Sequence, residues 1–259
     1  KAMDLGKLNS GASVGYVGEA QNIVQSTPGL GKLQLNSKKV AGIVGITNEL
    51  LRNPSVSADL MVRNELLRRI ALRRDLSFFR GTGTEFQPKG ILNWTRTANK
   101  ASQSGSTVTA IVSDLIGLIA LVDGADVDTT NAAWAFAPRT RWALAKVLDS
   151  QQRFVFAEMM ARGELFGFKF GTTTQIPINL GGGTNESEIY FGAFEDAILG
   201  RDSTTPLTVE LFQNGAFHDG TAVVSGISTD QSPIRIMEGH DVVLRHDAAF
   251  AILQAVTWS

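Results

Sequence analysis

The stretch "FFRGTGTEFQPKGILNW", residues 78–94, decides the fold, and its two glycines Gly81 and Gly83 first suggest a phosphate-binding loop. The dinucleotide fingerprint needs a third glycine where Phe86 stands, and it needs a strand before the loop. The phosphate-loop pattern fails as well, because no Gly-Lys-Ser/Thr follows. Pro88 and Gly90 oppose a helix directly after the loop. We therefore interpret the stretch as a sharp turn from a helix into a strand that holds no phosphate.

Residues 58–79, just before the loop, carry the clearest helical pattern of the chain. Val62, Leu66 and Ile70 recur every four residues and predict one apolar face. Ser57 is the predicted N-cap, and Asp59 suits the first turn of a helix. The opposite face carries five arginines with two carboxylates among them: Arg63, Arg68, Arg69, Arg73, Arg74, Glu65 and Asp75.

Crowded like charges stabilise an isolated helix little, so these arginines need an explanation. A plain solvated cationic face is one interpretation. The other is that neighbouring subunits supply matching carboxylates, which makes the charged residues of this face candidate inter-subunit contacts.

The N-terminal residues have no pattern of a compact core. Residues 1–15 predict an extended arm. Residues 16–46 predict a long hairpin, with strands around 17–24 and 33–46 and a turn at 26–31. Ordering such segments costs conformational entropy, which burial against another chain usually offsets. We expect both segments to project.

The rest of the chain mixes helices and strands without a βαβ or sandwich rhythm, which predicts the α+β class. Helices are predicted over 110–122, with Thr109 as the N-cap, over 138–150, and over 192–200. Strands are predicted over 132–138, 207–212, 233–238 and 241–256.

Composition excludes several classes of function. Of the residues, 43% are apolar and 19% charged, as in ordinary globular proteins. The 24 Lys and Arg against 25 Asp and Glu give a net charge of −1, which argues against a surface built to hold nucleic acid. There is no cysteine, so disulfides, thiol nucleophiles and cysteine metal sites are excluded. The longest apolar runs, such as residues 115–122, are too short to span a bilayer.

Candidate catalytic residues are few. His240 and His246 lie an even number of residues apart, so a regular strand would place them on one face. A metal site would need a further ligand, and polar strand-edge residues are the favoured interpretation. A hydrolase or metal enzyme that uses these histidines and nearby aspartates is the least favoured hypothesis. We expect no catalytic site, no metal and no cofactor.

The order of motifs resembles that of the major capsid proteins of tailed bacteriophages. In that family a strand runs into an Asn/Ser-Glu-Leu-Leu segment, here residues 48–51, and a long helix follows. A Phe-x-x-Gly-x-Gly loop and a Gln-Pro-x-Gly-Ile-Leu segment come next, matched here by Gly81, Gly83, Gln87, Pro88, Gly90, Ile91 and Leu92. Four later segments resemble the family in the same order: 135–156, 165–177, 189–201 and 239–253. Two positions differ from the family pattern: Ala193 stands where the family has Asp, and His240 stands where Arg is common.

The resemblance implies a phage major capsid fold. Residues 1–15 would be the N-terminal arm and 16–46 the extended loop. Residues 47–104 would form the peripheral domain, with the spine helix at 58–79 and the glycine-loop connector at 80–92. Residues 105–202 would form the axial domain, and residues 203–259 would return to the peripheral domain as a sheet.

The resemblance also implies a function. Such a chain forms pentamers and hexamers of itself in an icosahedral head shell around double-stranded DNA, which it contacts without sequence specificity. It would be located in the virion after assembly in the host cytoplasm, with portal, scaffold or protease, and decoration proteins as further partners and no membrane. An encapsulin-type nanocompartment, which has a similar fold, is the alternative.

Two processing events follow from the resemblance. The chain begins at Lys1, so it is either a trimmed piece or, as in many family members, the product of a protease that removes a scaffolding segment. Some members join subunits by an isopeptide bond between a loop lysine and a distant asparagine. Lys32 is suitably placed in the predicted hairpin loop, but residues 231–239 hold no asparagine, only Glu238. We therefore expect a shell without covalent cross-links.

Overall fold

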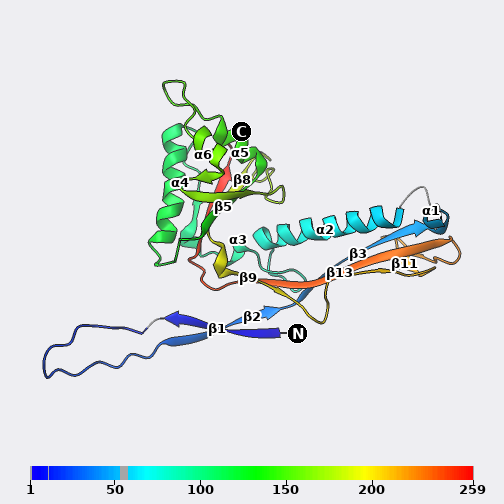
Figure 1. The fold of residues 1–259 in the computed structure, drawn as a ribbon, viewed down its shortest axis with the longest axis horizontal. Coiled ribbons are helices and arrows are strands. Elements are labelled where there is room, and N and C mark those ends of the chain that lie inside the picture. The colour runs from blue at the N-terminus through cyan, green and yellow to red at the C-terminus, as the bar shows by residue number, and fades with distance from the viewer. Residues whose placement is uncertain (1, 11, 53–57, 259) are drawn as a thin grey trace.

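The computed structural model describes residues 2–10, 12–52 and 58–258. Figure 1 shows a compact part around α4, β5 and β8, an elongated part in which α2 lies along β3 and β13, and a hairpin of β1 and β2 that extends away from both. Helices and strands are mixed in irregular order, so the predicted α+β class is confirmed. None of the helices in the described residues is both long and apolar enough to cross a bilayer.

The elongated part is an antiparallel sheet covered by one long helix. The strand β13 (Gln231–Leu244) pairs with three others: β3 (Lys38–Thr47), β10 (Thr208–Leu211) and β9 (Ala197–Arg201). The helix predicted over 58–79 is present as α2 (Ala58–Arg80). Its residues Leu66 and Ile70 pack on Ile46, Ile234 and Ile236 of the sheet. The predicted cap Ser57 lies outside the described residues.

The compact part is a six-stranded sheet in the order β4-β14-β8-β5-β7-β6. Its strands are β4 (Lys100–Ser102), β14 (Phe250–Val256), β8 (Ser187–Ala193), β5 (Ala132–Phe136), β7 (Phe168–Thr172) and β6 (Glu164–Leu165). The helices of this part are α4 (Val108–Asp123), α5 (Pro138–Ala145) and α6 (Ala157–Arg162). The α4 residues Ile111, Leu115, Leu118 and Val122 are buried in its core at helical spacing, which explains why this helix forms here.

Short elements complete the structure, and the two strands among them pair with each other in a separate sheet. They are α1 (Asn48–Arg52), α3 (Ile91–Trp94), η1 (Thr97–Asn99), η2 (Phe194–Asp196), β11 (Phe217–His218) and β12 (Val223–Val224).

Several predicted boundaries are wrong for identifiable reasons. The cap of α4 is Thr107, not Thr109, because the Thr107 hydroxyl accepts the Ala110 N–H at 3.3 Å. The helix predicted to run to residue 150 ends at Ala145, since Asp149 accepts the backbone N–H groups of Gln151 and Arg153 in a turn.

The helix predicted over 192–200 is wrong: only the short turn η2 separates two strands there. The backbone of residues 197–201 is paired by β13 instead. The two strands predicted over 233–238 and 241–256 are also placed wrongly. Gly239 pairs with Lys39 without a break, so β13 continues to Leu244, and the turn falls at 245–249.

The hairpin is formed by other residues than predicted. The strand β1 (Ala2–Ser10) pairs antiparallel with β2 (Gly29–Asn36), so residues 2–10 are a hairpin strand and not a free arm. The strand predicted at 17–24 is wrong, because residues 12–28 form the connecting loop, and the predicted turn at 26–31 is partly in β2. The register places Leu5 opposite Leu33. Leu33 and Leu35 pack on Val243, with Leu5 beside them, so this pairing covers the apolar base of the hairpin.

Candidate functional site

The glycine loop after α2 brings two backbone segments into direct contact. The Gly81 N–H donates to the Ser77 carbonyl at 2.9 Å, and the Gly90 N–H donates to the Gly81 carbonyl at 2.9 Å. A Cβ at Gly81 would collide with the carbonyl oxygen of Pro88, and a Cβ at Gly90 would collide with the Gly81 nitrogen. Only glycine allows this approach.

The loop closes on itself and then starts a helix. Gly83 has φ +73° and donates its N–H to the Pro88 carbonyl at 3.1 Å. The Gln87 N–H donates to the Thr84 carbonyl at 3.2 Å. The expectation that a strand follows the loop is wrong: α3 begins at Ile91, because the Gly90 carbonyl accepts N–H groups of the next turn. The loop therefore links two helices at a fixed angle.

Most arginines of α2 find carboxylates within the same chain. Arg63 contacts Asp59 at 2.8 Å, and Arg69 and Arg68 contact Glu65 at 2.6 and 3.8 Å. These pairs are exposed, so each contributes about 0–1 kcal/mol. Among the described residues, Arg73 and Asp75 have no ion-pair partner. The paired arginines therefore do not need a carboxylate from a neighbouring subunit. That neighbouring subunits contact this face stays a prediction.

Two buried carboxylates fasten the end of α2 to both parts of the molecule. Glu238 of β13 has a side chain only 2% exposed and lies 3.1 Å from Arg74 and 3.7 Å from Arg201. Glu188 of β8 is 3% exposed and lies 3.4 Å from Arg80. A buried carboxylate needs such partners to remain charged.

The second of these carboxylates also perturbs a tyrosine. The Tyr190 hydroxyl donates to Glu188 at 2.7 Å. Burial raises the pKa of Tyr190 well above 10.0, and the nearby Glu188 carboxylate is the second cause of this rise. The Tyr190 hydroxyl therefore stays protonated and acts as a donor. Neither Arg80 nor Glu188 was found from the sequence, because the two are far apart in the chain and no local spacing connects them.

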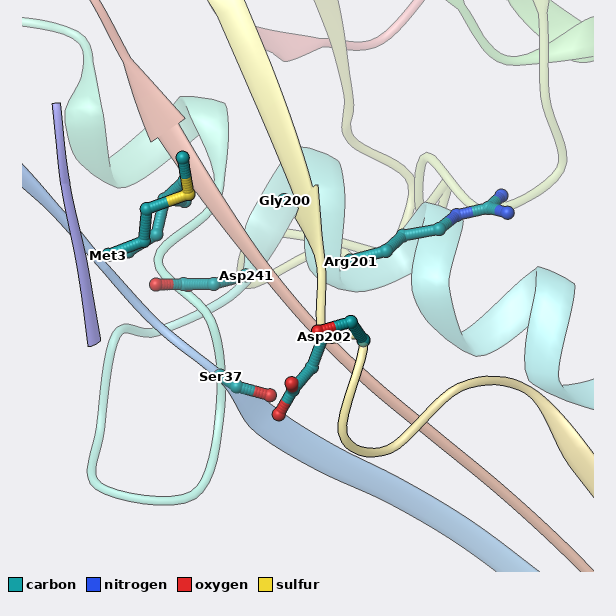
Figure 2. A pocket seen from close by; sticks show the side chains of 8 residues that line it. Met3, Ser37, Gly200, Arg201, Asp202 and Asp241 are labelled. Carbon is teal, nitrogen blue, oxygen red and sulfur yellow. The ribbon is translucent and has the colours of Figure 1, made fainter. Parts of the chain in front are cut away.

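The base of the hairpin is held by two further carboxylates, which line a cavity of about 300 Å³. Asp241 accepts the Asn36 N–H at 2.6 Å and its neighbour Val242 N–H at 2.8 Å. Figure 2 shows the side chains of Ser37 and Asp202 pointing toward each other beside the same cavity. The junction between β2 and β3 is thus fixed to β13 and to the residue that follows β9.

Asp202 gives this junction a pH dependence. The Thr204 backbone N–H, and then the hydroxyls of Ser37 and Thr205, lower the pKa of Asp202 from 3.8 to about 2. A lowered carboxyl pKa stabilises the fold above pH 3.8, and that contribution is lost as the pH falls through about 2.

The far end of the hairpin exposes apolar side chains that the described chain leaves uncovered. These are Val14, Tyr16, Val17, Ile23, Val24 and Leu30. Lys32 lies on β2 opposite Gly6, with its Nζ 3.5 Å from Asp4, so it is on a strand and not in the connecting loop as expected. The strand begins as early as Gly29, which moves Lys32 away from the tip.

A model of the phage capsid family matches residues 3–255, nearly the whole of this projecting hairpin, helix and two-sheet arrangement. The chain belongs to the phage capsid family. The resemblance inferred from the glycine loop and the later motifs is thereby confirmed.

Curated relatives of this phage capsid chain carry capsid names. It is 30% identical over 249 residues to the major capsid protein of Klebsiella oxytoca phage phiKO2, covering 94% of this chain and 58% of the relative. It is 25% identical over 257 residues to the capsid polyprotein of Pseudomonas phage PAJU2, and the match covers 96% of this chain and 38% of the relative. The chain therefore spans little more than half the length of one relative and less of the other.

Solved capsids share the fold of this phage capsid chain. The capsid of the native GTA particle matches with a TM-score of 0.75 at 17% identity, over 98% of this chain and 84% of that one. A chain of Mycobacterium phage Adephagia matches with a TM-score of 0.76 at 14% identity, and the match covers 98% of this chain and 84% of that one. The predicted capsid fold class is thus confirmed.

The histidines of this capsid chain are not brought together. His240 is buried in β13, with Nε2 3.4 Å from the Ser77 hydroxyl. His246 follows the end of β13, and its Nδ1 lies 3.0 Å from Asp196. The expectation of one shared strand face is wrong because the strand ends at Leu244. Within the described residues no group of three or more His, Cys, Asp or Glu side chains could hold a metal ion.

Proposed function

We propose that this chain is the major capsid protein of a tailed phage, which assembles as pentamers and hexamers into an icosahedral shell around double-stranded DNA. Membership of the phage capsid family and the capsid names of its relatives support the proposal. The same membership supports a structural role, and the proposal is that this role is non-catalytic.

The observation that carries the proposal is the hairpin, which projects from the rest of the chain (Figure 1) and exposes apolar side chains at its far end. Fully burying one large apolar side chain contributes about 1.5–3 kcal/mol. Six such side chains stand uncovered between Val14 and Leu30, so contact with a second copy would offset the entropy of ordering the loop. Identical contacts repeated head to tail close into rings and shells, and many weak contacts sum to tight association.

The two parts of the structure suggest a division of roles. We assign the elongated part, with α2 and the sheet of β13, to the peripheral domain, with α2 as its spine helix. We assign the compact part to the axial domain around the five-fold and six-fold positions. The strand β14 pairs with β8 in the compact sheet, which supports placing it in the axial domain and not in the return sheet at 203–259. Residues 2–36 form the extended loop in this assignment.

The same proposal covers the wider setting of the protein. It includes packaged DNA held without sequence recognition, contacts with portal, scaffold or protease, and decoration proteins, and assembly in the host cytoplasm. Lys32 and the charged face of α2 remain proposed inter-subunit contacts, and the shell is proposed to lack covalent cross-links.

Electron microscopy of particles purified from cells that produce the complete phage tests this function. We expect closed shells built of this chain, with double-stranded DNA inside that resists added nuclease. Shells that hold an enzyme and no protected DNA would favour the encapsulin-type alternative. Absence of this chain from the shells would contradict both.

A further inference from the structure

A cationic cavity lies where α2, β3, β13 and the glycine loop meet. Its volume is about 390 Å³. Its lining includes Lys38 and Lys39 of β3 and Arg73 of α2, and none of its described lining residues is acidic. Successive residues of a strand face opposite ways, and Val40 and Gly42 face α2, so the Lys38 side chain is on the side of the helix and the Lys39 side chain is on the other face. The positive charges of Lys38 and Arg73 on one side of the cavity favour a bound anion.

Arg73 differs from the other arginines of its helix. Arg63, Arg68, Arg69 and Arg74 all have carboxylate partners within the chain. Within the described part of the chain, Arg73 has none, although its guanidinium offers five N–H donors in a planar fork that suits two oxygens of one anion.

A polar side chain of the loop adds a further donor at the cavity. The Gln87 side-chain oxygen accepts the Thr82 hydroxyl at 2.9 Å, which fixes the orientation of the amide. Its two N–H groups are therefore left to donate elsewhere. Lys38 uses one N–H of its Nζ for the Glu85 carbonyl at 2.6 Å and has no carboxylate partner among the described residues, so two of its donors remain.

His240 closes the cavity and leaves one ring nitrogen without a partner. The residue is only 2% exposed, and its Nδ1 has no hydrogen-bond partner. The Ser77 hydroxyl donates its proton to the Arg74 carbonyl at 2.8 Å, so it must accept the Nε2–H of His240 at 3.4 Å. The neutral ring then carries its bare lone pair on Nδ1.

We propose that this cavity binds a phosphate group, either as the free anion or as part of a nucleic-acid backbone. Arg73 and Lys38 supply the charge, and Gln87 supplies a hydrogen bond. A phosphate carries up to two negative charges and several acceptor oxygens, which match this set of donors. The cavity is large enough to admit a group attached to the phosphate. The glycines take no part, so the proposal needs no phosphate-loop motif, but the use of Gln87 departs from the expectation that residues 78–94 hold no phosphate.

Anion binding is coupled to the charge of His240. Burial is the main cause that lowers the pKa of His240 below 6.5, so the ring is mostly neutral at pH 7. The charged groups around it are Arg73 and Arg74 of α2, Glu238 and Asp241 of β13, Arg201 of β9, and Lys38 and Lys39 of β3. A bound anion favours the protonated ring, so anion affinity rises as the pH falls.

Calorimetric titration of the unassembled chain with inorganic phosphate at low ionic strength tests the site without reference to shell formation. We expect saturable binding at one site. Arg73→Gln removes a charge-assisted hydrogen bond and should weaken binding about tenfold. The control Arg68→Gln removes an arginine of the same helix that faces Glu65, and it should leave phosphate affinity unchanged.

Two further arms identify the source of the anion and the part of His240. Displacement of phosphate by a short DNA duplex would assign a nucleic-acid backbone, and failure to displace it would assign the free anion. Sulfate does not titrate near neutral pH, so its affinity should rise between pH 7 and pH 5.5 in the wild type but not in His240→Gln. Absence of saturable phosphate binding, or equal weakening by both arginine variants, would overturn the proposal.

Discussion

At the scale of single residues, the contact between Gly81 and Gly90 fixes the exit of α2. The Gly90 nitrogen donates to the Gly81 carbonyl, and a Cβ on either residue would collide with backbone atoms that cannot move independently. Gly117 provides a contrast, because it lies inside α4, where an added Cβ would meet no atom of another element within 4 Å.

We predict that Gly90→Ala lowers the free energy of unfolding by about 1–3 kcal/mol or more, because the added methyl forces the crossing backbones apart. The matched variant Gly117→Ala should raise it by about 0.5–1 kcal/mol, because alanine favours the helix interior. Urea unfolding of the unassembled chain measures both. Equal effects of the two substitutions would mean that the contact is not required.

The sequence predicted a turn at these glycines but did not show why a side chain is excluded there. The spacing of Gly81 and Gly83 predicted a turn, and the turn is present. The atoms that exclude a side chain at Gly81 belong to Ser77 and Pro88 and become neighbours only after folding. Which glycine is indispensable therefore depended on geometry that a linear pattern does not contain.

At the scale of elements, the end of α2 is the joint between the two parts of the molecule. Arg74 reaches Glu238 of the elongated sheet, and Arg80 reaches Glu188 of the compact sheet. Exposed pairs earlier in the helix have the same chemistry without burial. Glu65 faces Arg68 and Arg69, much as Glu238 faces Arg74 and Arg201.

We predict that Glu238→Gln lowers the free energy of unfolding by about 2–4 kcal/mol, because it leaves Arg74 partly buried without its counter-charge. The control Glu65→Gln makes the same chemical change at an exposed pair and should cost less than about 1 kcal/mol. Chemical unfolding monitored by circular dichroism compares them. Similar small losses for both would show that the buried pair does not hold the helix.

Elements with strong local periodicity were predictable, and those defined by distant partners were not. The apolar repeat of Val62, Leu66 and Ile70 predicted α2 almost to its ends. The hairpin was predicted in the right region with the wrong strands, because its pairing is chosen by the contact of Leu5 and Leu33 with Val243. Glu238 and Glu188, the partners of Arg74 and Arg80, could not be foreseen for the same reason.

At the scale of the whole molecule, the hairpin is fixed at its base and uncovered at its far end. Asp241 holds the junction of β2 and β3, whereas Tyr16, Ile23 and Val24 stand exposed on the connecting loop. Such a surface is unfavourable on a protein that remains a monomer, and it is explained if copies cover it for one another. The incomplete burial of this chain is thus the physical basis of the proposed shell.

Sedimentation velocity over a range of concentrations tests this claim most directly. The wild-type chain should sediment as pentamers, hexamers or larger species that increase with concentration. A variant with Tyr16→Ser, Ile23→Ser and Val24→Ser should remain folded by circular dichroism yet sediment as a monomer. A wild-type chain that stays a compact monomer at every concentration, indistinguishable from the variant, would contradict the claim.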